Sequence, residues 1–277
     1  NDITIMTFDK PNMENRAMYG LDERVKIDYV NAGDYRDNQK TPGKYARSVI
    51  RVLNNKTGCF NTPGMVETLK NAFFPKHLQK RLTNYLNSKD YDVIIATAGN
   101  ALTLAYVADD LKAKTVGWQH NCYDTYVLQK GILFWKKEEI LKKYLPKLNS
   151  YVVLNEYDRR DFKEKLGIDC VAMDNPRSFT SEEKTDLGQK QFFVAARFVE
   201  QKGMDLLIDA FAKFCTVDDE WKLVIAGDGP LRAEVLDRVW MRKVQDRAEF
   251  IGQIMCRNIS FSLLCIFFLP DGKAGGL

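Results

Sequence analysis

The fold is decided by residues 191–211, which read QFFVAARFVEQKGMDLLIDAF. The apolar run over residues 191–196 is typical of a parallel strand buried on both faces, because such strands lack polar alternation. Residues 203–214 then place apolar side chains at helical spacing on one face. These side chains are Met204, Leu207, Ala210, Phe211 and Phe214. A strand followed directly by an amphipathic helix predicts one half of a βαβ unit.

The same pattern recurs immediately downstream. Residues 221–231 read WKLVIAGDGPL, a buried strand that runs into a glycine-rich turn. A helix is predicted from residue 231 towards residue 243, and a further strand over residues 248–251. Strands that alternate with helices predict a parallel sheet, so this part of the chain is expected to be Rossmann-like.

The upstream half alternates in the same way, up to a break in the pattern. Strands are predicted over residues 2–8, 25–30, 91–98, 115–120 and 150–154, and helices over residues 65–86, 101–111, 132–145 and 156–166. Residues 173–176 interrupt the alternation, and the polar stretch after them is typical of a linker. We therefore expect two parallel-sheet α/β domains, residues 1–172 and 173–277.

Composition excludes several functional classes. The net charge of +4 is small for 277 residues, and no nucleic-acid-binding signature accompanies it. The six cysteines contain no C-x-x-C pair, so we expect free thiols in a reducing cytoplasm and no zinc site. The apolar run over residues 259–269 is shorter than the roughly 20 residues that a membrane-spanning helix needs. A cytoplasmic protein is the expectation.

Two cations mark the first candidate site. Arg197 and Lys202 fall between a buried strand and the predicted start of a helix, where unpaired amides and the helix dipole favour anions. A diphosphate would suit such a place, although a solvated charged loop would have the same composition. The turn with Gly227 and Gly229 allows close approach of backbone to a ligand. It lacks the G-x-G-x-x-G spacing of dinucleotide binding, and the chain contains no P-loop.

Taken together, the motifs resemble glycosyltransferase family 4 and its GT-B fold, two Rossmann-like domains that face a cleft. The family pattern R-x-x-x-x-K-G corresponds to residues 197–203, and D-x-L-I-x-A-F to residues 205–211. The pattern G-x-G-P-L falls on residues 227–231, and F-x-G on residues 250–252. Looser matches lie upstream, at residues 117–121, 151–158 and 175–176.

The resemblance implies a role for each matched position. Arg197 and Lys202 would bind the donor diphosphate and neutralise the charge that develops on it. His120 would face the donor sugar, whereas a lone histidine at a strand end is otherwise a structural residue. The remaining positions would line the nucleotide side of the cleft. They are Gly227, Asp228 and Gly229 in the turn, and Gln253 and Ile254 near the nucleobase.

The implied activity is that of a retaining transferase. A UDP- or GDP-sugar would donate its sugar to a saccharide or lipid-linked acceptor in surface polysaccharide or glycolipid synthesis. No metal and no cofactor other than this donor are implied. The basic, aromatic helix over residues 132–145 would make peripheral contact with the inner membrane face, unless it is an ordinary surface helix with Glu–Lys pairs.

Both domains depart from the family pattern at their outer ends. The first would lack the opening strand and glycine-rich loop, and the second would lack the glutamate pair that follows the F-x-G strand. The alternative reading is therefore a catalytically inactive fragment that at most binds nucleotide. Another GT-B enzyme, such as a sugar-nucleotide epimerase, is disfavoured by R-x-x-x-x-K-G, and an oxidoreductase by the missing glycine fingerprint.

Overall fold

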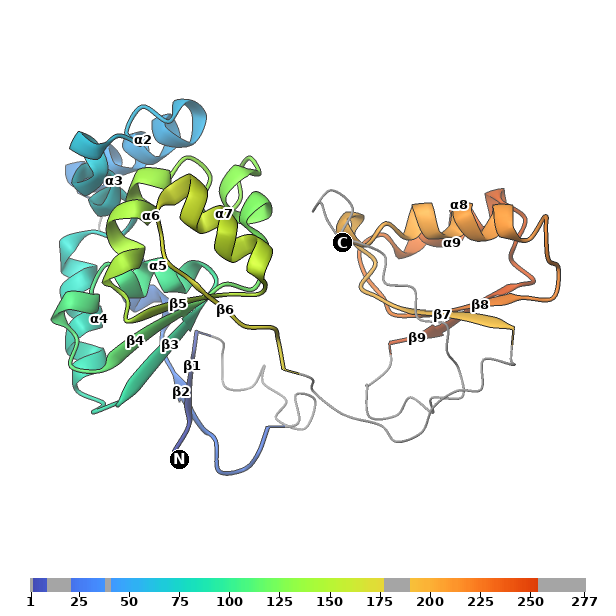
Figure 1. Ribbon diagram of the computed structural model, residues 1–277, viewed down its shortest axis with the longest axis horizontal. Coiled ribbons are helices and arrows are strands. Elements are labelled where there is room, and N and C mark those ends of the chain that lie inside the picture. The colour runs from blue at the N-terminus through green and yellow to red at the C-terminus, as the bar shows by residue number, and fades with distance from the viewer. Residues whose placement is uncertain (1, 9–20, 38–40, 177–189, 254–277) are drawn as a thin grey trace. The chain divides into compact units, whose positions relative to one another are not determined.

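The computed structural model describes residues 2–8, 21–37, 41–176 and 190–253, and the chain divides into two compact units. Unit 1 is Asn1–Pro176 and unit 2 is Arg177–Leu277 (Figure 1). The sequence placed a domain boundary at residue 172. The roles expected for the two domains, acceptor side and nucleotide side, stay predictions.

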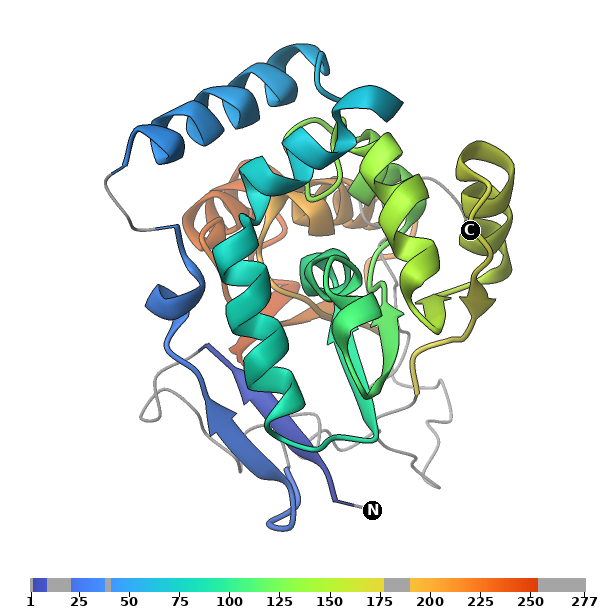
Figure 2. The same cartoon turned by 90° about the vertical axis from the view of Figure 1, so that its left-hand side faces the viewer.

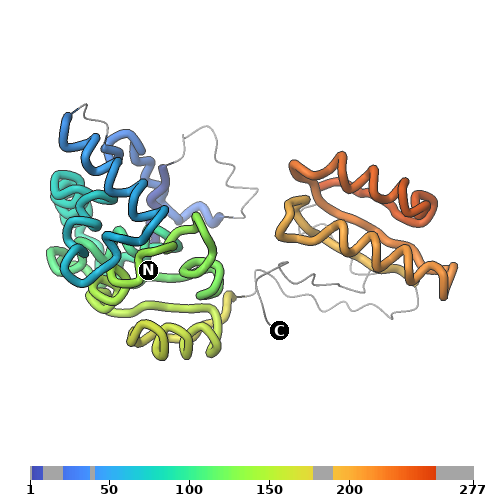
Figure 3. The backbone as a smooth tube through the Cα atoms, turned by 90° about the horizontal axis from the view of Figure 1, so that it is seen from above, coloured from blue at the N-terminus to red at the C-terminus, as the bar shows by residue number. Residues whose placement is uncertain are grey.

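Unit 2 contains a parallel sheet in the order β7-β8-β9. Its strands are β7 (Gln191–Ala195), β8 (Lys222–Ala226) and β9 (Ala248–Gly252), and its helices are α8 (Met204–Phe214) and α9 (Arg232–Met241). Both helices lie on the same side of the sheet (Figure 1), and they run side by side (Figure 3). Phe198, Ile208 and Ile225 are fully buried in this core, which fixes the strand ends that form the pocket described below.

Unit 1 contains two parallel sheets. A two-stranded sheet pairs β1 (Thr4–Thr7) with β2 (Lys26–Tyr29). A four-stranded sheet follows the order β3-β4-β5-β6. Its strands are β3 (Val93–Thr97), β4 (Lys114–Trp118), β5 (Ser150–Val153) and β6 (Val171–Ala172). All observed strand pairs are parallel, so the predicted parallel-sheet α/β fold class is confirmed.

Six α-helices accompany these sheets among the described residues of unit 1. They are α2 (Pro42–Thr57), α3 (Val66–Phe73), α4 (Lys76–Asn87), α5 (Gly99–Ala105), α6 (Glu138–Tyr144) and α7 (Glu156–Leu166). Helix α7 shows why local sequence predicts such elements well. Asn155 caps its first turn by accepting a hydrogen bond from the Asp158 amide, and Gly167 ends it in a left-handed conformation, φ 71°.

The helical material predicted over residues 65–86 forms two helices (Figure 2), because Pro75 cannot continue α3 and instead caps the start of α4. Two other predicted helices differ from the structure. The helix predicted over residues 101–111 is α5 followed by a short 3₁₀ turn. Of the helix predicted over residues 132–145, only α6 is α-helical, and Tyr144 leads into a further 3₁₀ turn.

Two further findings bear on composition. Cys59, Cys122, Cys170 and Cys215, the cysteines within the described ranges, are free thiols. Among the described residues, no helix combines the length and apolar character needed to cross a bilayer.

Candidate functional site

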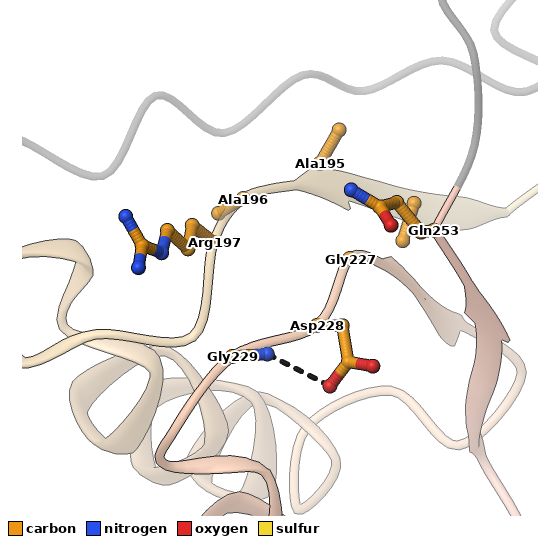
Figure 4. A pocket seen from close by; sticks show the side chains of 8 residues that line it. Ala195, Ala196, Arg197, Gly227, Asp228, Gly229 and Gln253 are labelled. Atoms are coloured by element: carbon orange, nitrogen blue, oxygen red, sulfur yellow. Dashed lines mark hydrogen bonds between the residues drawn. The ribbon is translucent and has the colours of Figure 1, made fainter. Parts of the chain in front are cut away.

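A pocket of about 590 Å³ opens where the strands of unit 2 end (Figure 4). Strands β7 and β8 pair in parallel with Ala195 opposite Ala226, so their carboxyl ends lie at the same level. Ligands bind beyond this edge in open α/β sheets. The lining residues are Ala195, Ala196, Arg197, Ala226, Gly227, Asp228, Gly229 and Gln253.

Five of the predicted site residues therefore come together, and three alanines join them. Ala195, Ala196 and Ala226 were not predicted as site residues. Their side chains are small, so the pocket keeps its volume directly at the strand ends. The available signal was alanine, rather than a larger apolar residue, at the last position of β7 and of β8.

Backbone hydrogen bonds hold the two loops of the pocket together. The Phe198 amide donates to the Asp228 carbonyl at 2.9 Å, and the Leu231 amide donates to the Phe198 carbonyl at 3.2 Å. A Cβ atom on Gly227, where φ is 134°, would lie 1.9 Å from the Ala196 carbonyl oxygen. On Gly229 it would lie 2.5 Å from the Phe198 carbonyl oxygen. Both glycines are thus required by the crossing of these loops.

The pocket carries charge of both signs. Arg197 is exposed, and Figure 4 shows it and Gln253 on opposite sides of the pocket. The Asp228 carboxylate accepts a hydrogen bond from the Gly229 amide at 2.7 Å and lies 3.9 Å from the Arg232 guanidinium. Helix α9 begins at Arg232, close to this turn, so its amino-terminal amides add positive potential. The arrangement can receive an anion beside Arg197.

Lys202 lies just before α8, where the sequence placed it, and its contact with the donor diphosphate stays a prediction. It ends a 3₁₀ turn, Glu200–Lys202, and it is not among the residues that line the pocket. Gly203 follows in a left-handed conformation, φ 55°, and α8 begins at the next residue. The turn tightens the chain just before the helix, so Lys202 lies at the mouth of α8 and half-buried. Ile254 lies outside the described residues.

His120 belongs to unit 1 and follows β4. Its ring is exposed and stacks on Trp118, with 5.3 Å between ring centroids and 24° between planes. Gln119 beside it is fully buried. The Gln119 side chain donates to the Asn121 carbonyl at 2.7 Å and accepts from the Tyr151 hydroxyl at 2.8 Å. This network fixes the backbone on which His120 stands, and sequence reasoning missed it.

These features define the class of protein: a parallel α/β protein with a ligand pocket at the carboxyl edge of its sheet. Residues 177–269 match the model of the family described as Glycosyl transferases group 1. The resemblance to this family, inferred from the motifs, is thereby confirmed for that part of the chain.

Three curated relatives align with this chain. Alpha-monoglucosyldiacylglycerol synthase of Streptococcus pneumoniae is 24% identical over 54% of this chain and 38% of its own length. Exopolysaccharide phosphotransferase SCO2592 of Streptomyces coelicolor is 24% identical over 99% of this chain and 28% of its own. Mannosylglucosylglycerate synthase of Petrotoga mobilis is 25% identical over 51% of this chain and 39% of its own. The aligned segments thus span less than two fifths of each relative.

Solved glycosyltransferases share the fold. TarM of S. aureus has a TM-score of 0.55 at 16% identity, covering 68% of this chain and 39% of TarM. The lipopolysaccharide outer core galactosyltransferase WaaB has a TM-score of 0.52 at 15% identity, covering 71% of this chain and 55% of WaaB. These are GT-B proteins, so the expected GT-B fold class is confirmed.

Proposed function

We propose that this chain forms part of a retaining, metal-independent hexosyltransferase that takes its sugar from a UDP- or GDP-sugar. The acceptor would be a saccharide or a lipid-linked saccharide, in surface polysaccharide or glycolipid synthesis. The reaction would take place in the cytoplasm, at the inner face of the membrane where the acceptor is lipid-linked.

The observation that carries the proposal is the pocket of unit 2. Its volume of about 590 Å³ falls within the range of roughly 300–1,000 Å³ common for small-molecule sites. Arg197 offers a fixed positive charge there, and the turn around Gly227 and Gly229 offers backbone without side chains. A nucleoside diphosphate needs both a cation for its phosphates and open backbone for close approach.

In the proposed reaction the bond between the anomeric carbon and the diphosphate oxygen breaks. A bond from the same carbon to the acceptor oxygen forms on the same face, and the acceptor proton passes to the leaving phosphate. Arg197 and Lys202 would stabilise the negative charge that grows on the diphosphate. His120 would hydrogen-bond the donor sugar.

The names of related proteins support this class of substrate. The relatives include synthases named for a glucosylated diacylglycerol and for mannosylglucosylglycerate. One TarM structure is titled as a complex with UDP and alpha-GlcNAc-glycerol, and pneumococcal GtfA as a complex with UDP and GlcNAc. The relative that aligns with 99% of this chain is named a phosphotransferase, which makes transfer of a sugar phosphate the second candidate.

Nucleotide affinity tests the site. Titration calorimetry with UDP and GDP would compare the unchanged chain with Arg197→Ala and Lys202→Ala. Each substitution removes a charge-assisted contact, so affinity should fall about tenfold or more. Lys213→Ala is the matched control, because Lys213 is exposed at the opposite end of α8, and it should bind normally. Unchanged affinity for UDP and GDP in both site variants would contradict the proposal.

A transfer assay separates the remaining readings. The chain would be incubated with donor labelled in the sugar and, in parallel, with donor labelled in the phosphate next to it. Sugar label alone in the product is the expected result. Both labels in the product would identify the phosphotransferase instead. Nucleotide binding with no product would identify an inactive fragment.

A further inference from the structure

The pocket of unit 2 contains a carboxylate among the groups that are proposed to receive a diphosphate. Asp228 lines the pocket together with Arg197, and it lies in the turn between Gly227 and Gly229 (Figure 4). Its side chain is exposed, at 58% of its surface. A negative group in a pocket for anions weakens the binding of an anion, because like charges repel. The charge of Asp228 therefore acts against some of the anions that the pocket can meet.

The Asp228 carboxylate is held in a fixed place. The Phe198 amide donates to the Asp228 carbonyl at 2.9 Å, which anchors the backbone, and the Gly229 amide donates to Oδ1 at 2.7 Å (Figure 4). No described residue donates a hydrogen bond to Oδ2. A charge that is already fixed acts on a ligand without first having to be ordered. Asp228 is therefore a permanent feature of the empty pocket as well as of the occupied one.

One cation, Arg232, offsets the charge of Asp228 only in part. Its guanidinium lies 3.9 Å from Oδ1, at the outer limit of an ion pair, and no hydrogen bond joins the two side chains. The Arg232 side chain is itself 43% exposed. Ion pairs between exposed side chains contribute little, because water screens both charges. Asp228 thus keeps a negative potential at its wall of the pocket.

The proposed reaction increases the negative charge of its nucleotide. In a nucleoside diphosphate sugar each phosphate carries one negative charge. When the bond between the anomeric carbon and the diphosphate oxygen breaks, both bonding electrons stay on that oxygen. The acceptor proton passes to the leaving phosphate, which then loses it to water, because the second pKa of such a phosphate is about 6. At neutral pH the product therefore carries about one negative charge more than the donor.

Arg197 and Asp228 respond to this added charge in opposite directions. The Arg197 guanidinium attracts the product more strongly than the donor, so by itself it would retain the nucleoside diphosphate after transfer. The Asp228 carboxylate repels the product more strongly than the donor. In the transition state only part of the added charge has developed, whereas in the product it is complete. The repulsion therefore weakens product binding more than it slows the transfer.

We propose that Asp228 is a specificity-determining residue that lowers affinity for the nucleoside diphosphate product relative to the nucleotide-sugar donor. The inference deepens the proposed function, on which it rests in one respect: the diphosphate has to bind beside Arg197. The pocket then combines a cation that stabilises the leaving group with a carboxylate that favours its release. A fresh donor molecule meets less competition from the product of the previous transfer.

Titration calorimetry of the whole chain with UDP and with UDP-glucose tests the inference, because these ligands differ by about one charge. GDP and GDP-mannose replace them if the chain binds guanine nucleotides. Asp228→Asn should raise affinity for UDP about threefold or more relative to UDP-glucose. Asparagine keeps an oxygen for the Gly229 amide, so the turn retains its hydrogen bond. Asp228→Glu keeps the charge and should retain the original ratio of affinities. The measurements use about 0.01 M salt, and about 1 M salt should remove most of the difference by screening.

Asp237→Asn is the matched control, since Asp237 is an exposed aspartate of α9 outside the pocket lining. It should keep the ratio of the unchanged chain. Equal gains for UDP and UDP-glucose in Asp228→Asn, no gain, or a difference that persists at high salt overturns the inference. Weaker binding of both ligands by Asp228→Asn overturns it in favour of a hydrogen bond from the carboxylate to the nucleotide.

The same samples separate this inference from the proposed function. If the unchanged chain binds nucleotide, and Arg197→Ala weakens that binding while Asp228→Asn leaves the ratio unchanged, only the role of Asp228 is refuted. If the unchanged chain binds none of the four nucleotides, both the proposed function and the role of Asp228 are refuted. Circular dichroism would verify that each variant is folded.

Discussion

The two units fix the carboxyl edges of their sheets by different means. In unit 2 the loops after β7 and β8 cross backbone to backbone. The crossing leaves no room for a side chain at Gly227 or Gly229. In unit 1 the chain after β4 is held by a buried side chain, Gln119, which bonds Tyr151 across to β5. Backbone crossing restricts the residue type to glycine, whereas a side-chain network can be assembled from many residues. The first kind of edge can therefore be recognised in a sequence, and the second cannot.

The largest effect is expected at the crossing in unit 2. Gly227→Ala would place Cβ 1.9 Å from the Ala196 carbonyl oxygen at a φ of 134°. Relief requires the two loops to separate, which should lower the free energy of unfolding of unit 2 by about 4 kcal/mol or more. Chemical denaturation, monitored by tryptophan fluorescence, would measure this change in the free energy of unfolding. Gly64→Ala, which has no atom within 4 Å of the added Cβ, should be neutral. Similar free energies of unfolding for the two variants would contradict the claim that the loop crossing requires glycine at residue 227.

A substitution in the Gln119 network of unit 1 should lower the free energy of unfolding by an intermediate amount. Gln119→Leu keeps the volume but leaves the buried Tyr151 hydroxyl without its acceptor, which should cost about 2 kcal/mol of unfolding free energy. Adding Tyr151→Phe removes the unpaired hydroxyl, so the double variant should be more stable than Gln119→Leu alone. Urea denaturation of the four proteins of this cycle measures the coupling. Strictly additive losses would show that the network does not hold the edge.

A smaller, pH-dependent effect is expected where α8 meets α9. The Arg238 guanidinium, and next to it that of Arg242, hold the pKa of Asp209 well below its usual range. Both donate to its carboxylate, with Nε–Oδ1 distances of 2.8 Å. A lowered carboxyl pKa stabilises the fold above the pKa of the unfolded chain, about 4. This stabilisation is lost as pH falls through the folded-state value.

Asp209→Asn should therefore lower the Tm by a few degrees at pH 7 and by less near pH 3. Thermal unfolding followed by circular dichroism at both pH values measures the difference. Asp246→Asn, an exposed aspartate of the same unit, is the control and should leave the Tm unchanged. An Asp209→Asn deficit that stays constant from pH 7 to pH 3 would contradict the role of the carboxylate charge.

The elements of unit 2 follow from the sequence to within about two residues at either end. The predicted strand over residues 191–196 is β7, and the predicted helix over residues 203–214 is α8. Five predicted site residues line one pocket because they follow the ends of neighbouring parallel strands: Arg197 follows β7, Gly227–Gly229 follow β8 and Gln253 follows β9. Local signals suffice when a site is built from the carboxyl ends of the strands of one sheet.

Helix α2 shows what local signals leave out. It is not among the helices predicted from the sequence, although Thr41 caps its first turn and Gly58 ends it in a left-handed conformation, φ 79°. Its orientation could not have been predicted either. Partners distant in sequence, Ala72 and Lys136, bind its polar face, and Val49 and Val52 are left exposed. Which face of a helix is buried depends on tertiary contacts.

The smallest change in the free energy of unfolding is expected for a substitution of His120. Its size decides whether this residue stabilises the fold or is available to a ligand. Its ring is exposed and contributes a stack on Trp118 but no part of the Gln119 network. His120→Ala should therefore cost less than about 1 kcal/mol of unfolding free energy, against about 2 kcal/mol for Gln119→Leu. His77→Ala, at the exposed other histidine, is the control. Near-ultraviolet circular dichroism would report loss of the stack. If His120→Ala destabilises unit 1 as much as Gln119→Leu does, the histidine is part of the framework of this edge. The proposed contact with the donor sugar would then lose its support.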